Sequence, residues 1–156
     1  MTHAVVLAIG LLAALPQTAT PRPSPAAAEQ EIREFEQKYN GAYAANDLRT
    51  YFSYLAADFT QWLPSGRTDK AAYQQSWTRF INGGGKVLAA DIAELHVKIG
   101  PSGDTAVASY LLHVKTHSTR GDSDETYQET DVLFRRDGTW KVVALHYSPA
   151  PAKKTP

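Results

Sequence analysis

Residues 125–148, ETYQETDVLFRRDGTWKVVALHYS, decide the fold of this chain. Polar and apolar residues alternate on either side of Asp137-Gly138, which is typical of two half-buried antiparallel strands. An Asp-Gly pair between such runs is a strong hairpin signal, because both residues adopt the positive φ that a tight turn needs. The segment therefore predicts strands over about 125–135 and 139–148, joined by a short turn.

Two further runs with a period of two lie upstream, over 87–99 and 105–116. Before them, apolar residues recur at helical spacing, and a short strand at 58–63 ends in a turn at Pro64-Ser65-Gly66. The predicted helices cover about 29–46, 48–55 and 69–82. Helices followed by an antiparallel meander indicate an α+β fold, with the helices on one face of a curved sheet.

Composition excludes several kinds of site. The 156 residues contain no cysteine, so the chain cannot form a disulfide framework, a thiol nucleophile or a cysteine zinc site. Sixteen Lys and Arg balance sixteen Asp and Glu, which predicts no broad basic surface and no nucleic-acid partner. No metalloprotease, P-loop or dinucleotide motif is present, so neither a metal nor an organic cofactor is expected.

The N-terminal segment predicts export. The uncharged apolar run Ala4 to Leu15 is shorter than the roughly 20 residues that span a bilayer. A Pro-rich stretch follows and ends at Ala26-Ala27-Ala28, a small-residue cleavage signal. We predict a signal segment at 1–28, a domain at 29–149 and a disordered tail at 150–156. After cleavage no stable membrane span is expected, and the protein would be periplasmic or secreted.

The order and length of the elements resemble the cone-shaped nuclear transport factor 2-like superfold, which includes ketosteroid isomerase, scytalone dehydratase and SnoaL-like cyclases. The closing segment is similar to the end of the calcium/calmodulin-dependent protein kinase II association domain. The shared features in this segment are Glu-Thr at 129–130, Arg-Arg-Asp-Gly-x-Trp at 135–140 and His-x-Ser at 146–148, followed by prolines. Upstream, His96-Val-Lys-Ile-Gly100 is also shared. The resemblance covers about 29–151. It implies three N-terminal helices packed on a curved antiparallel sheet around a cavity.

The same resemblance also shows where this chain departs from the kinase family. That family's cavity arginines bind small carboxylates, and their positions fall on Leu112, Asp131 and Tyr147. A cavity histidine of the family falls near Ala71. Because none of these residues is a cation here, carboxylate binding is not implied. A cavity that binds a small organic molecule remains the expectation.

Asp131 is the main candidate for chemistry. It interrupts an apolar strand run, where β-propensity disfavours Asp. If Asp131 faces a cavity, desolvation raises its pKa and makes it a candidate general acid or base, as in ketosteroid isomerase. The alternative is a solvated edge position or a salt bridge to a neighbouring arginine.

The neighbours of Asp131 depend on the turn. A two-residue loop at Asp137-Gly138 places Asp131 opposite Ala144, on the face of His146. A three-residue loop places Asp131 on the face of Tyr147, where the pair could act as base and oxyanion donor. The resemblance favours the second register. The predicted catalytic residues are therefore Asp131, with Tyr147 or His146.

Two strand aromatics near the expected cavity mouth, Trp62 and Tyr110, are candidate ligand-binding residues. The resemblance adds the cavity positions Leu112, Asp131 and Tyr147. His113 and His117 lie four residues apart on one strand, a separation of about 13 Å that prevents them from sharing a metal. We expect both histidines on the surface.

Three functions follow from these features. The leading one is an exported domain that binds a small organic molecule in an apolar cavity. The first alternative is a cofactor-independent isomerase, dehydratase or cyclase with Asp131 as general acid or base. The second is an association module that forms a homodimer through its sheet, because the final hairpin is apolar on both faces. The predicted partition places Val132, Phe134, Trp140 and Val142 on the outer, convex face that would pair with the second copy. It places Leu133, Val143 and Leu145 on the other face.

Overall fold

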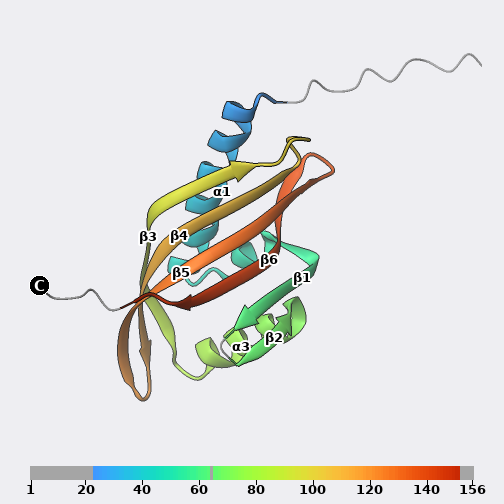
Figure 1. The fold of residues 1–156 in the computed structure, drawn as a ribbon. Helices are drawn as coiled ribbons and strands as arrows, with labels where there is room; N and C mark the ends of the chain where they lie inside the picture. Colours follow the sequence, from blue (N-terminus) through green and yellow to red (C-terminus); the bar gives the residue numbers. More distant parts are fainter. Residues whose placement is uncertain (1–22, 64, 152–156) are drawn as a thin grey trace, which may run out of the picture.

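The computed structural model describes residues 23–63 and 65–151. Within these ranges the chain forms three helices and six strands, with the helices gathered on one side of a curved sheet (Figure 1). The elements are α1 (Pro25–Ala44), α2 (Leu48–Ser53), β1 (Leu55–Leu63), β2 (Gly66–Asp69), α3 (Lys70–Asn82), β3 (Lys86–Ile99), β4 (Thr105–Ser118), β5 (Gly121–Arg136) and β6 (Thr139–Pro149). This is the α+β arrangement predicted from the sequence, with the β1–β2 hairpin between α2 and α3.

All six strands belong to one sheet, in the order β2-β1-β6-β5-β4-β3. Strands β3 to β6 form the predicted antiparallel meander. Strand β1 pairs in parallel with β6 and brings the β1–β2 hairpin and α3 beside the last strands of the chain (Figure 1). Residues from both halves of the sequence therefore meet at this end of the sheet.

Helix α1 begins upstream of its predicted start at Glu29. The Ser24 side chain accepts a hydrogen bond from the backbone N–H of Ala27, and Pro25 occupies the first turn, where its missing N–H costs nothing. Ala28, the last residue of the predicted signal segment, is fully buried in this helix. The cap and the burial of Ala28 explain why the helix extends further than periodicity alone indicated.

Two predictions concern residues outside those that the structure describes. The apolar run lies within 1–22, and the tail prediction falls mostly on 152–156. Among the described residues, none of the helices is long and apolar enough to cross a membrane.

Helix α3 agrees with its prediction, whereas β2 was missed. Asp69 caps α3 by accepting a hydrogen bond from Ala72 N at 2.9 Å, and the helix ends at Asn82, before the glycine run. The four residues of β2, predicted in part as a turn, pair with β1 as a short edge strand. Gly66 has a φ of 123°, which lets the chain reverse directly into this pairing.

The final hairpin combines features of both predicted registers. Its loop has two residues, Asp137 and Gly138, with φ values of 51° and 76°, as a type I′ turn requires. A β-bulge at Val143 then shifts the pairing, so that Asp131 lies opposite Leu145 and not Ala144. Asp131 therefore has the inner-face position expected from the three-residue loop, reached through a bulge that neither prediction included.

The bulge also corrects the predicted partition of the hairpin. Trp140 and Val142 were expected on the outer face, but both are buried on the inner face, where Val142 lies opposite Leu133 and Trp140 lies opposite Arg135. Trp140 Nε1 donates to Glu31 of α1 at 2.9 Å, which fixes its ring against the helix. Val132 and Phe134 remain on the outer face, as predicted.

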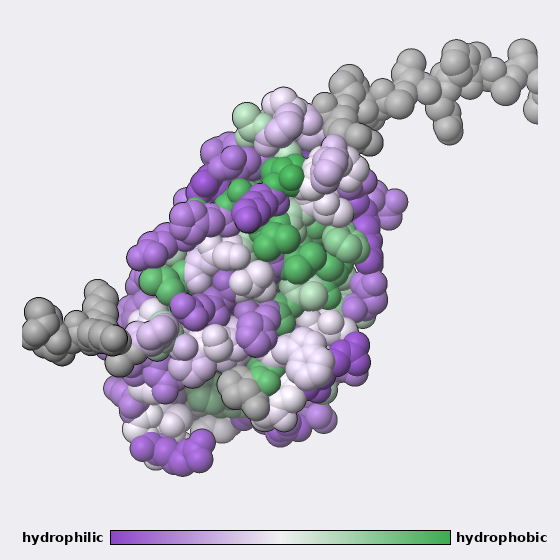
Figure 2. Space-filling model, in the orientation of Figure 1, coloured by the Kyte–Doolittle hydropathy of each residue, from purple (hydrophilic) through white to green (hydrophobic). Residues whose placement is uncertain are grey.

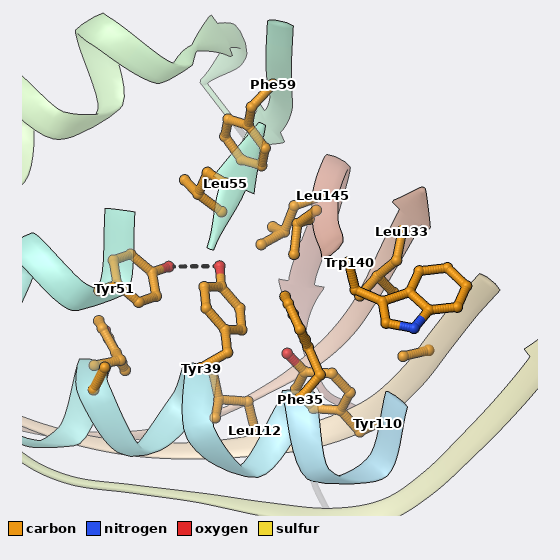
Figure 3. Packing of buried hydrophobic residues seen from close by; sticks show 14 of the residues in the cluster. Phe35, Tyr39, Tyr51, Leu55, Phe59, Tyr110, Leu112, Leu133, Trp140 and Leu145 are labelled. Atoms are coloured by element: carbon orange, nitrogen blue, oxygen red, sulfur yellow. Dashed lines mark hydrogen bonds between the residues drawn. The ribbon is translucent and has the colours of Figure 1, made fainter. Parts of the chain in front are cut away.

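The core fills the space between α1, α2 and the inner face of the sheet (Figure 3). Phe35 and Tyr39 point from α1 into this space, and Tyr39 reaches toward Leu55 and donates a 2.9 Å hydrogen bond to Tyr51 of α2 (Figure 3). Burial of these large side chains is the main driving force for the fold. It leaves the region under α3 less completely filled.

Candidate functional site

A cavity of about 600 Å³ lies between α3 and the inner face of the sheet. Two aromatic pairs shape its wall: Tyr43 with Trp77, and Tyr127 with Tyr147. The rings of each pair meet edge to face, with centroids 5.0 and 5.1 Å apart. Helices α1 and α3 and strands β5 and β6 therefore give this cavity an aromatic wall.

Glu129 supplies a carboxyl group at the inner end of this cavity. Along β5, the cavity-lining residues change from the exposed Glu125 through the half-buried Tyr127 to Glu129, which is only 7% exposed. Strand alternation places these residues on one face. Burial raises the pKa of Glu129 to about 7.

Tyr110 links Glu129 to Asp131. Its hydroxyl oxygen lies 2.8 Å from Glu129 Oε1, 3.0 Å from Asp131 Oδ2 and 3.3 Å from the amide nitrogen of Asn40. A tyrosine hydroxyl has one proton to donate, and Asn40 Nδ2 is itself a donor. Full pairing of the three contacts therefore requires that one of the two carboxyls carries a proton.

A third acidic residue, Glu36, packs against this group from α1. Glu36 is fully buried, and neither of its carboxyl oxygens has a partner at full hydrogen-bonding geometry among the described residues, although Tyr110 and Asp131 lie close enough to lower its pKa in part. Burial and the neighbouring Glu129 raise the pKa of Glu36 to about 8. The pKa of Asp131 is also raised well above its ordinary value. Burial has the largest effect, and the charges of Glu36 and Glu129 add to it. We refer to Glu36, Glu129 and Asp131 as the carboxyl cluster.

None of the ion pairs among the described residues includes a member of the carboxyl cluster. Because an unpaired carboxylate is costly to bury, the cluster retains protons at pH values where exposed carboxylates are ionised. The arrangement can therefore give or take a proton at the inner end of the cavity.

Four of the predicted site residues gather here. Leu112 and Tyr147 line the cavity directly. Tyr110 and Asp131 are buried behind the lining, next to Glu129, so Asp131 reaches the cavity only through its neighbours. Tyr147 shares a sheet face with Asp131, but the residue directly opposite Tyr147 is Glu129.

The placement of two predicted residues was wrong. Trp62 is 55% exposed, because Gln61 and Leu63 take the inward positions of β1. His146 is exposed on the same outer face, level with Trp62 on the neighbouring strand. The bulge at Val143 sets this orientation of His146, so neither side chain reaches the cavity.

The sequence interpretation missed Glu36, Asn40, Gln61 and Glu129. Glu36 and Asn40 follow Ile32 at steps of four, so they lie on the apolar face of α1, where a charged residue is unexpected. Glu129 lies two residues before Asp131, on the same strand face. These spacings were the available signals. For Gln61, the only available sequence signal was the alternation of inward and outward residues along β1.

The two histidines of β4 face solvent. His113 Nε2 lies 2.5 Å from Asp124, and His117 Nδ1 lies 2.6 Å from Asp122, with each pair bridging β4 and β5. Within 23–63 and 65–151, no three potential metal ligands come together. The histidines therefore belong to surface pairs at the tip of the β4–β5 hairpin.

Several solved structures share this fold. A nuclear transport factor 2-like protein of unknown function in nutrient uptake from Rhodospirillum rubrum is 22% identical, with a TM-score of 0.68 over 77% of this chain and 98% of its own. A nuclear transport factor 2-like protein from Cytophaga hutchinsonii is 24% identical, with a TM-score of 0.68 over 78% and 97%. The association domain of calcium/calmodulin-dependent protein kinase II from Caenorhabditis elegans is 21% identical, with a TM-score of 0.65 over 80% and 97%.

No curated protein matches the sequence. A family model does match it, over residues 32–153, which include every strand and all but the first turns of α1. The fold, the cavity on the inner face of the sheet and this match agree, and the chain belongs to the SnoaL-like domain family.

Proposed function

We propose that this domain binds a small organic molecule in the cavity under α3. The observation that carries the proposal is the position of Glu129, a buried carboxyl group at the inner end of a 600 Å³ aromatic-walled space. Small-molecule sites typically combine a concave apolar wall with a few polar groups that orient the ligand. The four wall aromatics and Glu129 have this composition.

The energetic cost of the carboxyl cluster supports a functional role. A buried polar group without a partner costs about 1–3 kcal/mol. Both oxygens of Glu36 and Oδ1 of Asp131 lack partners among the described residues. An apolar residue at either position would avoid that cost, so the cluster is better explained by the cavity that it adjoins than by stability.

Matched probes test this proposal. We expect 1-naphthylmethanol, 1-naphthylmethylammonium or 1-naphthylacetate to bind the purified domain in calorimetric titrations, and Leu112→Trp to abolish binding by filling the cavity. Val107→Phe enlarges an exposed residue of the outer sheet face and serves as the control that should bind normally. If none of the three probes binds, or if Leu112→Trp binds as the unchanged protein does, the proposal is wrong.

Catalysis in the same cavity is the second candidate. The predicted acid or base was Asp131, but Glu129 is the cluster residue that lines the cavity. In an isomerase or dehydratase, Glu129 would move the proton while Tyr110 and Asp131 adjust its pKa. Glu129→Gln would then abolish turnover even of a substrate that still binds.

Association through the outer sheet face is the third candidate. Val107 and Phe134 are 37% and 36% exposed there, and Val107 lies directly opposite Val132. Figure 2 shows hydrophobic residues gathered over the face formed by β4, β5 and β6. Structural neighbours that are association domains add support, and a homodimer is the proposed state.

Export remains a proposal that rests on the apolar run at 4–15 and the small residues at 26–28. The intact mass of the protein recovered from a native host tests it. Loss of the N-terminal segment together with a periplasmic or extracellular location is expected. Recovery of the complete chain from the cytoplasm would contradict it.

A further inference from the structure

The polar atoms at the inner end of the cavity are mainly hydrogen-bond acceptors. Glu129 contributes a carboxyl group, and Gln61, which is 1% exposed and lines the cavity, has an Oε1 atom without a partner among the described residues. A buried amide oxygen without a donor is costly and needs an explanation. A ligand with N–H groups would supply the missing donor.

Two donors at this end, the Asn40 side-chain amide and the Tyr110 hydroxyl, are already used within the protein. Asn40 lines the cavity, but its amide nitrogen donates to the Glu36 carbonyl at 3.0 Å and to the Tyr110 hydroxyl at 3.3 Å. Those bonds leave Oδ1, another acceptor, as the remaining polar atom of the Asn40 side chain. The single proton of Tyr110 goes to Glu129 or Asp131. Glu129, Gln61 and Asn40 together therefore offer acceptors to a ligand.

The aromatic wall is compatible with positive charge. The negative π-faces of Tyr and Trp rings attract cations within about 6 Å. Glu129 is close enough to Tyr43, Tyr73 and Tyr147 that its charge, after burial, contributes to raising the pKa of each. A positive group beside Glu129 would thus lie near these rings.

We propose that the cavity recognises an organic primary amine, with its ammonium group on Glu129, Gln61 and Asn40 and its apolar body against the aromatic wall. This inference rests on the proposed binding function and specifies its ligand class. An ammonium group carries three donors and a positive charge, which matches both the acceptors and a carboxyl cluster that has no cationic partner among the described residues.

Arg67 and Arg79 also line the cavity, but both are exposed near its mouth. Exposed charges are screened by solvent and salt, whereas the buried Glu129 acts at short range in a low dielectric. The inner carboxyl group therefore determines the charge preference for the ligand head group.

Binding of an ammonium group should depend on pH, because only ionised Glu129 pairs with it. The titratable groups around Glu129 come from every element packed against it: Glu36, Tyr39 and Tyr43 from α1, Tyr51 from α2, Tyr73 from α3, Tyr110 from β4, Asp131 from β5 and Tyr147 from β6. All of them have raised pKa values, so the tyrosines stay neutral over the relevant range. With a pKa of about 7 for Glu129, a protonated amine should bind about tenfold more tightly at pH 8 than at pH 6.

The same naphthyl probes test the charge preference. At pH 8 we expect 1-naphthylmethylammonium to bind at least about tenfold more tightly than 1-naphthylmethanol, and 1-naphthylacetate to bind weakest. Glu129→Gln should remove the preference for the cation and its pH dependence while 1-naphthylmethanol still binds. Glu94→Gln makes the same change at an exposed position of β3 outside the cavity lining and should leave both nearly unchanged.

The outcomes separate this inference from the proposed function. Equal or tighter binding of the alcohol or the acetate overturns the amine inference but leaves a ligand-binding cavity. A cation preference that persists in Glu129→Gln also overturns it. Absence of binding by all three probes overturns the binding function itself.

Discussion

At the scale of single residues, the carboxyl cluster makes the stability of this domain depend on pH in an unusual direction. The pKa values of Glu36 and Glu129 rise from 4.5 to about 8 and about 7. Between about pH 4.5 and these values the native state holds protons that the unfolded chain releases. The free energy of unfolding must therefore fall as pH rises through this window, by up to about 1.4 kcal/mol per pH unit for each such proton.

Surface carboxylates oppose this trend at lower pH. Hydrogen bonds from Thr50, Arg136 and His113 lower the pKa values of Asp47, Asp58 and Asp124, so their stabilisation is lost as pH falls below about 4. We predict maximum stability near pH 5 and a decline toward pH 8, measured by urea unfolding at each pH. A stability that rises steadily from pH 5 to pH 8 would contradict the burial of protonated carboxyls.

Glu36→Met tests the most buried member of the cluster. Methionine has a similar length and no polar atoms to leave without partners, so the variant should be more stable than the unchanged protein at pH 8, by about 1–3 kcal/mol. At pH 5 the gain should be smaller. Glu36 is then protonated in the folded protein and more often protonated in the unfolded chain than at pH 8, so its burial costs less free energy. Glu34→Met, at an exposed position of the same helix, is the matched control and should change stability little at either pH.

At the scale of elements, the type I′ turn between β5 and β6 sets the hairpin on which the site depends. Gly138→Ala introduces a Cβ where φ is 76° and should destabilise the domain by about 1–2 kcal/mol, although no atom lies near the added methyl group. Gly41→Ala, inside helix α1 and equally unobstructed, should instead stabilise it by up to about 1 kcal/mol. Thermal unfolding of both variants measures this contrast in sign, and a gain from Gly138→Ala would refute the turn geometry.

The elements were largely predictable, whereas the register of the last hairpin was not. Alternation and helical spacing are local properties, and they located every helix and the four long strands. A bulge such as that at Val143 arises from packing across the sheet, so the pattern around it did not reveal which face Trp140, Val142 and His146 would take. The candidate site was the part predicted least well. Glu129 is its central residue because other elements, β4 and α1, bring Tyr110 and Glu36 next to it.

At the scale of the whole molecule, the strands β4, β5 and β6 present two different surfaces. On the inner face of β5, Glu129 and Asp131 adjoin the cavity and Leu133 joins the core; on the outer face, Thr130, Val132 and Phe134 face away from the helices. Because strand side chains alternate, consecutive residues serve different surfaces. Substitutions on the outer face can therefore test association without altering the residues that line the cavity.

A substitution at the centre of the outer face tests the proposed homodimer. Val107→Lys places a charge directly opposite Val132 and should convert the dimer to a monomer, because burying an unpaired charge in an apolar interface is costly. Leu88→Lys changes a more exposed apolar residue, 54% exposed on β3, and is the control that should leave the dimer intact. Light scattering at several concentrations gives the mass of each variant. If the unchanged protein is a monomer at high micromolar concentration, or if Val107→Lys stays dimeric, this face is not the interface. Retention of 1-naphthylmethanol binding by a monomeric Val107→Lys variant would then show that the cavity is complete within one chain. The position of its lining residues on β1, β2, β4, β5, β6 and the three helices of one chain predicts this result.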